Sequence, residues 1–446
     1  MQRSINAVLL GTFTLRFSTG LTGAMLLYYL AQLPEFGGPE VSGSIAGIMT
    51  AAYFAAELVL SPLFGVLSDR VGAHRIMQVG PVLGAIAVIV TALTTDLWLL
   101  GGTRWVEGMA AAASIPSILG YIAIATSGNE GLRGQTVARF EAATIAGLGV
   151  GAVAAGPLFE VLGRGAFVAN AVVYAVSFVI YRYGVRRLDP DAEASAAAEE
   201  RPISSAEVRP ASGGFRRYAQ LLATSGVWLL APTWIALNAI IGAWTTQSVF
   251  QLVRDNPDGR FDDQLLMGGF EPSQVSIGLA VALVVFFAGI FVWGNLFRRY
   301  RRTTIIGVGI MGGMVMIGSV FAVNHSADWP IFAPVALVLL AIAGLFVLAG
   351  ATPAALGMLA DISESHPSDR GAIMGLYSVF LGLGQIVGSV SSGTAADWLG
   401  IDGLLAASVV LLVIALVPLR WLRGSEHLVG QRARSRPAHG EAQPLP

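Results

Sequence analysis

Apolar runs of 18 or more residues recur along the whole length of this 446-residue chain. Each run is long enough to cross the ~30 Å hydrocarbon core of a bilayer as one helix. Only 12% of the residues are charged, about half the share found in soluble domains. Because lipid offers no hydrogen bonds to the backbone, such runs have to be helical. The sequence therefore predicts an all-α, polytopic membrane protein.

Twelve such segments can be placed, and we expect them at residues 5–31, 43–67, 76–95, 97–126, 136–159, 165–183, 227–250, 276–297, 303–323, 331–358, 371–395 and 403–421. The stretch between the sixth and seventh segments is rich in Ala, Glu, Pro and Ser, which is typical of a flexible linker. The predicted organisation is an N-terminal six-helix bundle (1–183), a linker (184–226), a C-terminal six-helix bundle (227–423) and a disordered tail (424–446).

An internal repeat relates the two halves of the chain. Residues 112–163 resemble residues 349–400 at a constant offset of 237 without a gap, including glycines at 147, 151 and 156 that match glycines at 384, 388 and 393. These glycines make a smooth stripe for a neighbouring helix. Six spans return the chain to the same side, so the two repeats are parallel and related by an axis along the membrane normal. Transporters of this construction bind substrate near the middle of the membrane, between the repeats.

Arginine sets the orientation, since every one of the 27 basic residues is Arg. With the N-terminus inside, 22 of them fall in the cytoplasmic segments and only Arg164, Arg254 and Arg260 in the outer loops. This asymmetry obeys the positive-inside rule. We therefore expect a multi-pass protein of the plasma (inner) membrane with both termini, the linker and the tail in the cytoplasm. The long acidic loop at 251–275 is expected to be a solvated loop rather than a ligand-binding lid.

The loop after the second span reads Gly-Val-Leu-Ser-Asp-Arg-Val-Gly-Ala-His-Arg at residues 65–75. This resembles the signature of the major facilitator superfamily, G-x-L-A/S-D-R-x-G-R-R, with Ala73 in place of a basic residue. The resemblance covers the twelve spans, the linker and the parallel halves. It implies a cytoplasmic latch that holds the outward-open state, as opposed to ordinary topological charges. The predicted gate residues are Gly65, Asp69, Arg70, Gly72 and Arg75.

Four charged residues fall deep within the first, second and fourth spans: Arg16, Glu57, Arg104 and Glu107. At 1.5 Å per residue, each lies ~10–16 Å from the nearer end of its span. Intramembrane charges are costly and normally face a bundle interior or a wet cavity, where they are paired. Arg104 and Glu107 share a helix face at i and i+3. The four residues are therefore candidates for a compensated charge cluster.

The segment from Arg104 to Ala112 also resembles the fourth-span motif of the family, R-x-x-Q-G-x-x-A-A, whose arginine is linked to proton coupling in exporters. Glu107 replaces the usual Gln and adds a titratable group. Burial favours a protonated Glu and a nearby Arg opposes it, so moving the two apart would drive proton uptake. The alternative is a static structural salt-bridge cluster. The second half has Ala341 at the position of Arg104, which confines this chemistry to the first half.

The fifth span carries a glycine-rich sequence ending in Gly156-Pro157 that partly resembles the antiporter motif of exporters, although small residues for packing explain it equally well. Glu160 and its repeat counterpart Asp397 are expected to be solvated charges at the outer ends of their spans. By the same resemblance, the substrate-binding candidates of the second half are Trp234, Asn238, Trp244, Gln247, Phe286, Tyr377 and Gln385. Aromatic residues with few polar anchors suggest an apolar or amphipathic substrate.

These features favour a secondary transporter working by alternating access, most simply a proton-coupled antiporter for efflux of a small amphipathic compound. A facilitator or importer of a polar solute, a lipid flippase, and a membrane receptor that keeps the fold are the alternatives. A membrane-embedded enzyme is disfavoured, because the sequence shows no metal-ligand cluster and no nucleophile pattern. An ATP-driven pump is disfavoured too, because no phosphate-loop pattern is present. We expect no cofactor and no metal. The expected partners are a small-molecule substrate, protons and the bilayer, with a monomeric protein and no nucleic acid.

Overall fold

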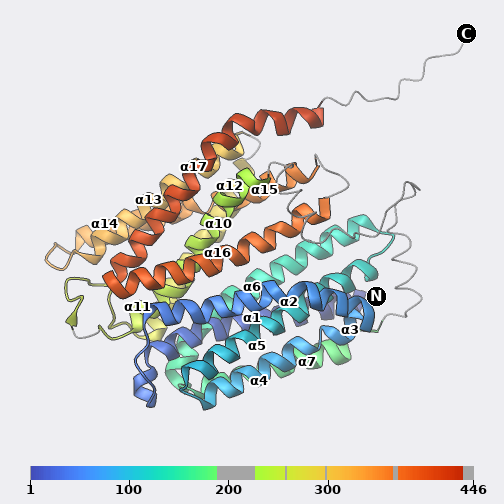
Figure 1. Cartoon of the computed structure of the whole chain (residues 1–446), viewed down its shortest axis with the longest axis horizontal. Helices are drawn as coiled ribbons and strands as arrows, with labels where there is room; N and C mark the ends of the chain where they lie inside the picture. Colours follow the sequence, from blue (N-terminus) through green and yellow to red (C-terminus); the bar gives the residue numbers. More distant parts are fainter. Residues whose placement is uncertain (1, 188–226, 257–258, 297–298, 365–369, 435–446) are drawn as a thin grey trace, which may run out of the picture. The chain divides into compact units, whose positions relative to one another are not determined.

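The computed structural model describes residues 2–187, 227–256, 259–296, 299–364 and 370–434, and these residues form helices joined by short connections (Figure 1). The helices of the first half are α1 (Gln2–Ala31), η1 (Leu33–Phe36), α2 (Gly43–Val71), α3 (Ala73–Ile76), α4 (Val79–Leu93), α5 (Leu97–Ala125), α6 (Glu130–Leu162), α7 (Gly165–Val179) and η2 (Ile180–Gly184). Polar side chains fix several of their starts. For example, Asp96 caps α5 by accepting from the Leu99 amide at 2.8 Å.

The helices of the second half are α10 (Val227–Ala243), η3 (Trp244–Ser248), α11 (Val249–Val253), α12 (Pro272–Leu296), α13 (Arg302–Asn324), α14 (Phe332–Leu348), α15 (Ala351–Glu364), α16 (Arg370–Leu399) and α17 (Ile401–Arg434). The tenth expected segment is divided into α14 and α15. α17 continues to Arg434, so residues 424–434 are helical where a disordered tail was expected. The rest of the tail and most of the linker lie outside the described residues.

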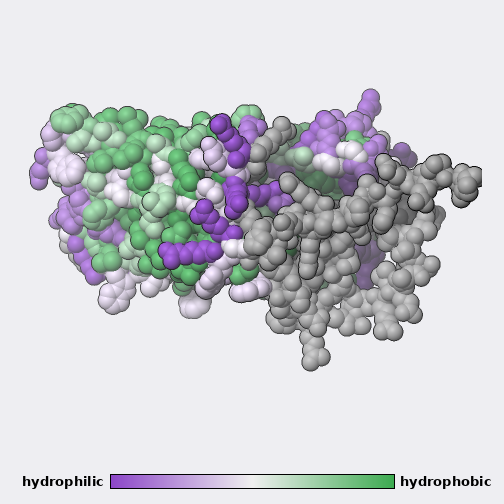
Figure 2. Space-filling model, turned by 90° about the horizontal axis from the view of Figure 1, so that it is seen from above, coloured by the Kyte–Doolittle hydropathy of each residue, from purple (hydrophilic) through white to green (hydrophobic). Residues whose placement is uncertain are grey.

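The fold class predicted from the sequence is confirmed, because every expected segment is a helix. Among the described residues, eleven helical segments are long and apolar enough to cross a membrane. α1 is 30 residues long and is not among them, because threonines, serines and Arg16 lower its hydropathy. Its polar residues are mostly buried, which explains how a bilayer protein accommodates it. Figure 2 shows hydrophobic side chains over a broad part of one face of the described chain.

Two compact units divide the chain. Unit 1 consists of Met1–Glu207, Gly242–Leu283 and Gln385–Leu404, and unit 2 of Val208–Ile241, Val284–Gly384 and Leu405–Pro446. The division differs from a simple cut at the linker. The ends of α10–α11, α12 and α16 that lie away from the arginine-rich loops belong to unit 1, because they pack on the first-half helices. We call this end of the helices the arginine-poor end.

Glycines bring α1 and α6 into close contact in unit 1. A Cβ added to Gly151 would lie 2.1 Å from the Phe17 carbonyl oxygen, and one added to Gly20 would lie 2.1 Å from the Leu148 carbonyl oxygen. Helices in lipid gain their packing energy from such close approach of backbones. In the glycine stripe that the sequence indicated in the fifth span, Gly147 and Gly151 therefore contact α1, whereas Gly156 contacts α12 at Pro272.

Candidate functional site

An ion pair is buried in the first half of α5. Arg104 and Glu107, one turn apart, are only 6% and 3% exposed, and an Arg104 guanidinium nitrogen donates to Glu107 Oε2. Within the described part of the chain, Glu107 Oε1 and Arg104 Nε have no hydrogen-bond partner. The pair is thus compensated in charge but retains hydrogen-bonding capacity, which buried polar atoms seldom do.

Tyr53 of α2 links this pair to a second set of charges, the buried Arg16, the half-buried Glu57 and the exposed Glu141. The Arg104 guanidinium lies over the Tyr53 ring, with the guanidinium carbon 4.9 Å from the ring centroid. The Tyr53 hydroxyl group is also within electrostatic range of Glu57 and Arg16. Tyr174 of α7 lies near Glu107 and Arg104 on another side. An aromatic ring thus lies between two sets of charges.

Arg16 of α1 is the centre of the second set. It is 7% exposed and interacts electrostatically with Glu57 of α2 and with Glu141 of α6. Arg16, Glu57, Arg104 and Glu107 therefore lie in one region of unit 1, as the sequence led us to expect. We refer to these four residues, together with Tyr53, Glu141 and Tyr174, as the charge cluster.

Small residues hold the helices of the charge cluster at close range. A Cβ added to Gly108 would lie 2.1 Å from the Tyr53 carbonyl oxygen, so α2 and α5 meet next to Glu107. A Cβ on Gly147 would lie 2.8 Å from the Arg16 Cβ, so α6 meets α1 beside Arg16. These two contacts set the spacing between α2 and α5 and between α1 and α6, the four helices that carry the charged side chains.

Sequence analysis missed Tyr53, Glu141 and Tyr174. Of the three, Glu141 carries the clearest signal in the sequence, because it is a carboxylate five residues inside an expected span. Tyr53 carries a weaker signal: it lies one turn before Glu57 on the same helix face. Nothing in the sequence singles out Tyr174 from the other tyrosines.

The predicted gate residues lie at the arginine-rich end of α2. Asp69 and Arg70 are exposed in its last turn, and Arg75 is exposed in α3. Gly72 ends α2 with φ 98° and donates its amide hydrogen to the Ser68 carbonyl, a conformation that favours glycine. Gly65 faces Pro116 of α5 at 3.9 Å from an added Cβ. The turn thus agrees with the motif, and its latch role stays a proposal.

The substrate-binding candidates separate between the units. In unit 2, Trp234 and Asn238 are buried and Asn238 donates to the Trp234 carbonyl at 2.8 Å, while Phe286 is half-buried. In unit 1, Gln247 is fully buried and donates to the Gly43 carbonyl at 3.0 Å. The other two candidates of unit 1 are Trp244, half-buried, and Gln385, 8% exposed. Tyr377 lies in α16, and its side chain is outside the described part of the structure.

The seventh span departs from regular α-helical geometry near two of these candidates. Residues Trp244–Ser248 form a π-helical turn, η3, between α10 and α11. Such turns often occur at functional sites because they re-aim side chains along a helix. Here the turn includes both Trp244 and Gln247, and it precedes the helix end at which Gln251 donates to Gln247 at 3.1 Å.

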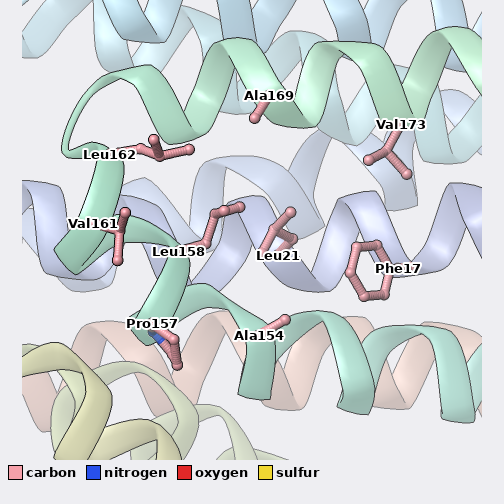
Figure 3. Close-up of a pocket in the computed structure, with 9 residues that line it drawn as sticks. All are labelled: Phe17, Leu21, Ala154, Pro157, Leu158, Val161, Leu162, Ala169 and Val173. Atoms are coloured by element: carbon pink, nitrogen blue, oxygen red, sulfur yellow. The ribbon is translucent and has the colours of Figure 1, made fainter.

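An apolar groove lies next to the charge cluster but offers different chemistry. It has a volume of about 590 Å³, and Figure 3 shows its lining side chains on α1, α6 and α7. They are Phe17, Leu21, Ala154, Pro157, Leu158, Val161, Leu162, Ala169 and Val173. A ligand site needs a few polar groups to orient its ligand, and this lining supplies none. The groove therefore offers no polar group that would orient a ligand.

One expectation about the arginine-poor end is wrong. Asp397 is not a solvated charge but accepts the amide hydrogens of Gly43 at 2.5 Å and Ser44 at 3.0 Å, at the N-terminus of α2. The physical reason is that a helix N-terminus carries free amide hydrogens and a positive partial charge, which attract a carboxylate. Glu160 is exposed, as expected, but also accepts the Ser273 amide at 3.1 Å.

Comparison with known proteins gives consistent matches along the chain. The sequence profile of the Major Facilitator Superfamily matches residues 8–268 and 219–445. The chain is 25% identical over 431 residues to the class C tetracycline resistance protein of Escherichia coli, covering 94% of this chain and 98% of that protein. It is 24% identical over 391 residues to the class B protein of the same organism, covering 85% and 88%.

A solved structure supports the same fold. The nucleoside transporter NupG superposes with a TM-score of 0.68 at 14% identity, covering 95% of this chain and 99% of that chain. At this identity the likeness speaks for the fold alone.

Proposed function

Because this chain belongs to the major facilitator superfamily, and is therefore a membrane transporter rather than an enzyme, we propose that it exports a small amphipathic compound in exchange for protons. In this proposal the protein works by alternating access as a monomer in the plasma (inner) membrane. The arginine-rich end, with both termini, is cytoplasmic. The gate residues Gly65, Asp69, Arg70, Gly72 and Arg75 form the cytoplasmic latch.

The observation that carries the proposal is the buried pair of Arg104 and Glu107. Two charges in a low-dielectric interior cost several kcal/mol each to desolvate, and apolar residues of the same size are often as stable. A carboxylate with one free oxygen beside a guanidinium can hold a proton when the guanidinium moves away and lose it when the guanidinium returns. The pair is thus suited to exchange protons.

Tyr53 extends this mechanism to the second set of charges. Its ring contacts Arg104, and its hydroxyl group lies near Glu57. A shift of α2 relative to α5 would move Tyr53 and Glu57, which both lie on α2, together relative to Arg104. We propose that this shift accompanies the change between the two access states, so that Glu57 and Glu107 respond together to one movement.

The relatives support the proposed direction and substrate class. Two proteins that match most of this chain are named for tetracycline resistance, and tetracycline is a polycyclic, amphipathic compound. The aromatic candidates Trp234, Trp244 and Phe286, with the amide groups of Asn238 and Gln385, suit a compound of this kind. We therefore propose drug-like amphipathic molecules as substrates and the outward direction of transport.

Transport in proteoliposomes tests the proposal. Purified protein is reconstituted, a pH gradient is imposed, and fluxes of tetracycline, nucleosides and fluorescent phospholipid are compared. The proposal predicts that the gradient drives tetracycline-like compounds against their concentration gradient. Nucleoside flux that ignores the gradient would identify a facilitator, and phospholipid movement a flippase. Either result, without gradient-driven drug flux, would contradict the proposal.

A further inference from the structure

Two repeat-related contacts close the arginine-poor end of unit 1. In the first, Asp397 of α16 binds the N-terminus of α2 through the amides of Gly43 and Ser44, and the Ser44 hydroxyl group also donates to Asp397. Gly43 and Ser44 precede Asp397 by 354 and 353 positions in the chain. The contact thus ties the start of the second span to the end of the eleventh. We call it the Asp397 clasp.

The backbones of the Asp397 clasp touch because both helices present glycine. A Cβ added to Gly393 would lie 2.3 Å from the Gly43 carbonyl oxygen, and a Cβ on Gly47 would lie 2.2 Å from the Ser389 carbonyl oxygen. The Gly43 carbonyl in turn accepts from Gln247 at 3.0 Å. The carboxylate is thus supported by close helix packing and by a buried amide side chain.

The second contact repeats the first at the offset of 237 residues. Gly156 and Glu160 of α6 occupy the repeat positions of Gly393 and Asp397. A Cβ on Gly156 would lie 2.0 Å from the Pro272 carbonyl oxygen, and Glu160 accepts the Ser273 amide at 3.1 Å, at the N-terminus of α12. We call this the Glu160 clasp. In each clasp a glycine allows the approach and a carboxylate one turn later binds a helix N-terminus.

The two clasps differ in strength. Asp397 is half-buried and accepts three hydrogen bonds, two from amides and one from a hydroxyl group. Glu160 is exposed and accepts one. Water weakens a charge interaction at an exposed position far more than at a buried one. The Asp397 clasp therefore provides most of the stabilisation, although Ser276 adds a hydrogen bond from the Gly156 amide at 3.0 Å to the second contact.

We propose that the two clasps are the outer gate of this transporter and that opening toward the outside breaks both. The proposal depends on the alternating-access function proposed above and on the orientation that places the arginine-poor end outside. It assigns Asp397 and Glu160 as positioning residues that set the balance between access states. Neither residue needs to contact the transported compound.

Cysteine labelling tests the gate directly, because the chain contains no cysteine. A Thr246→Cys reporter is suitable, since Thr246 is 1% exposed and donates to Thr50 at 3.3 Å. Thr50 lies seven residues into α2 from Gly43, which places the reporter ~10 Å deeper than the Asp397 clasp. A membrane-impermeant thiol reagent added outside then reports how often the outer gate opens.

Asp397→Asn is expected to raise the labelling rate about tenfold, equivalent to about 1.4 kcal/mol in the gate equilibrium, and Glu160→Gln about twofold. Asp96→Asn is the matched control, because Asp96 caps only its own helix at the same end. Its labelling rate should equal that of the Thr246→Cys protein without a further substitution. If Asp397→Asn destabilises folding, Ser44→Ala removes one donor and should raise labelling about threefold.

Labelling in Asp397→Asn and Ser44→Ala that equals labelling in Asp96→Asn would overturn the gate. A higher labelling rate in Glu160→Gln than in Asp397→Asn would also overturn the proposal. Labelling needs no transported compound, so a protein that moves nothing in proteoliposomes but shows these rates would retain the gate and lose the proposed function. A protein that transports the compound, but whose labelling rate is the same in all the variants, would keep the proposed function and lose the gate.

Discussion

Removing Glu107 while keeping Arg104 should destabilise the protein far more than removing both charges. Glu107→Ala leaves a guanidinium that is 6% exposed without its carboxylate, and breaking a buried pair in this way costs about 3–5 kcal/mol. The Tyr53 ring, 4.9 Å from the guanidinium carbon, contacts Arg104 in both proteins and so does not change this difference. The expected loss in the free energy of unfolding is therefore about 3–5 kcal/mol.

The double variant Arg104→Met/Glu107→Leu removes both desolvation costs and fills a similar volume. We expect its free energy of unfolding to lie within about 1 kcal/mol of the parent protein, or above it. The coupling between the two sites, obtained from the double-mutant cycle that also includes Arg104→Met and Glu107→Leu as single variants, should therefore be at least about 2 kcal/mol.

Reversible unfolding in mixed detergent micelles, followed by the fluorescence of the nine tryptophans, measures these free energies. Glu35→Ala is the control, because Glu35 is exposed and its loss should change stability by no more than about 0.5 kcal/mol. Equal destabilisation of the single and double variants would refute the reasoning, since it would show that packing, not charge compensation, dominates at this position.

Three further substitutions test the local geometry. Gly108→Ala should separate α2 from α5, because the new Cβ would lie 2.1 Å from the Tyr53 carbonyl oxygen, and the melting temperature should fall, whereas Gly102→Ala on the same helix, with nothing within 4 Å, should not lower it. Gly72→Ala should cost about 1–3 kcal/mol in unfolding titrations, because φ is 98° there. Asp96→Ala removes a helix cap and should cost about 1 kcal/mol in the same titrations.

Hydropathy predicted the helices closely, since an apolar run in lipid has no alternative to a helix. The expected second span, 43–67, and α2, Gly43–Val71, begin at the same residue. The sequence also indicated where Arg104 and Glu107 meet, because residues three apart on a helix share a face. In both cases one helix contains all the information that the prediction needs.

Features that depend on two helices were harder to predict. The bond from Asp397 to Gly43 depends on the rotation and the offset of two helices far apart in sequence, which composition does not determine. Tyr53 beside Arg104 depends likewise on the packing of α2 on α5 at Gly108. The internal repeat did contain a signal for the two clasps, because it pairs Gly156 with Gly393 and Glu160 with Asp397. Each pair of positions has the same role in helix packing, which explains why the repeat keeps a glycine and a carboxylate there.

Substrate-induced proton release from the purified protein is the most direct test of the charge cluster as the coupling site. The protein in weakly buffered detergent solution, with a pH-indicator dye, receives a compound that it transports in proteoliposomes. The account predicts proton release from the parent protein and much less from Glu107→Gln, in which only Glu57 can still respond, although that variant still binds the compound by tryptophan fluorescence. Equal proton release from the two proteins would contradict the assignment of Glu107 as the residue that exchanges the proton.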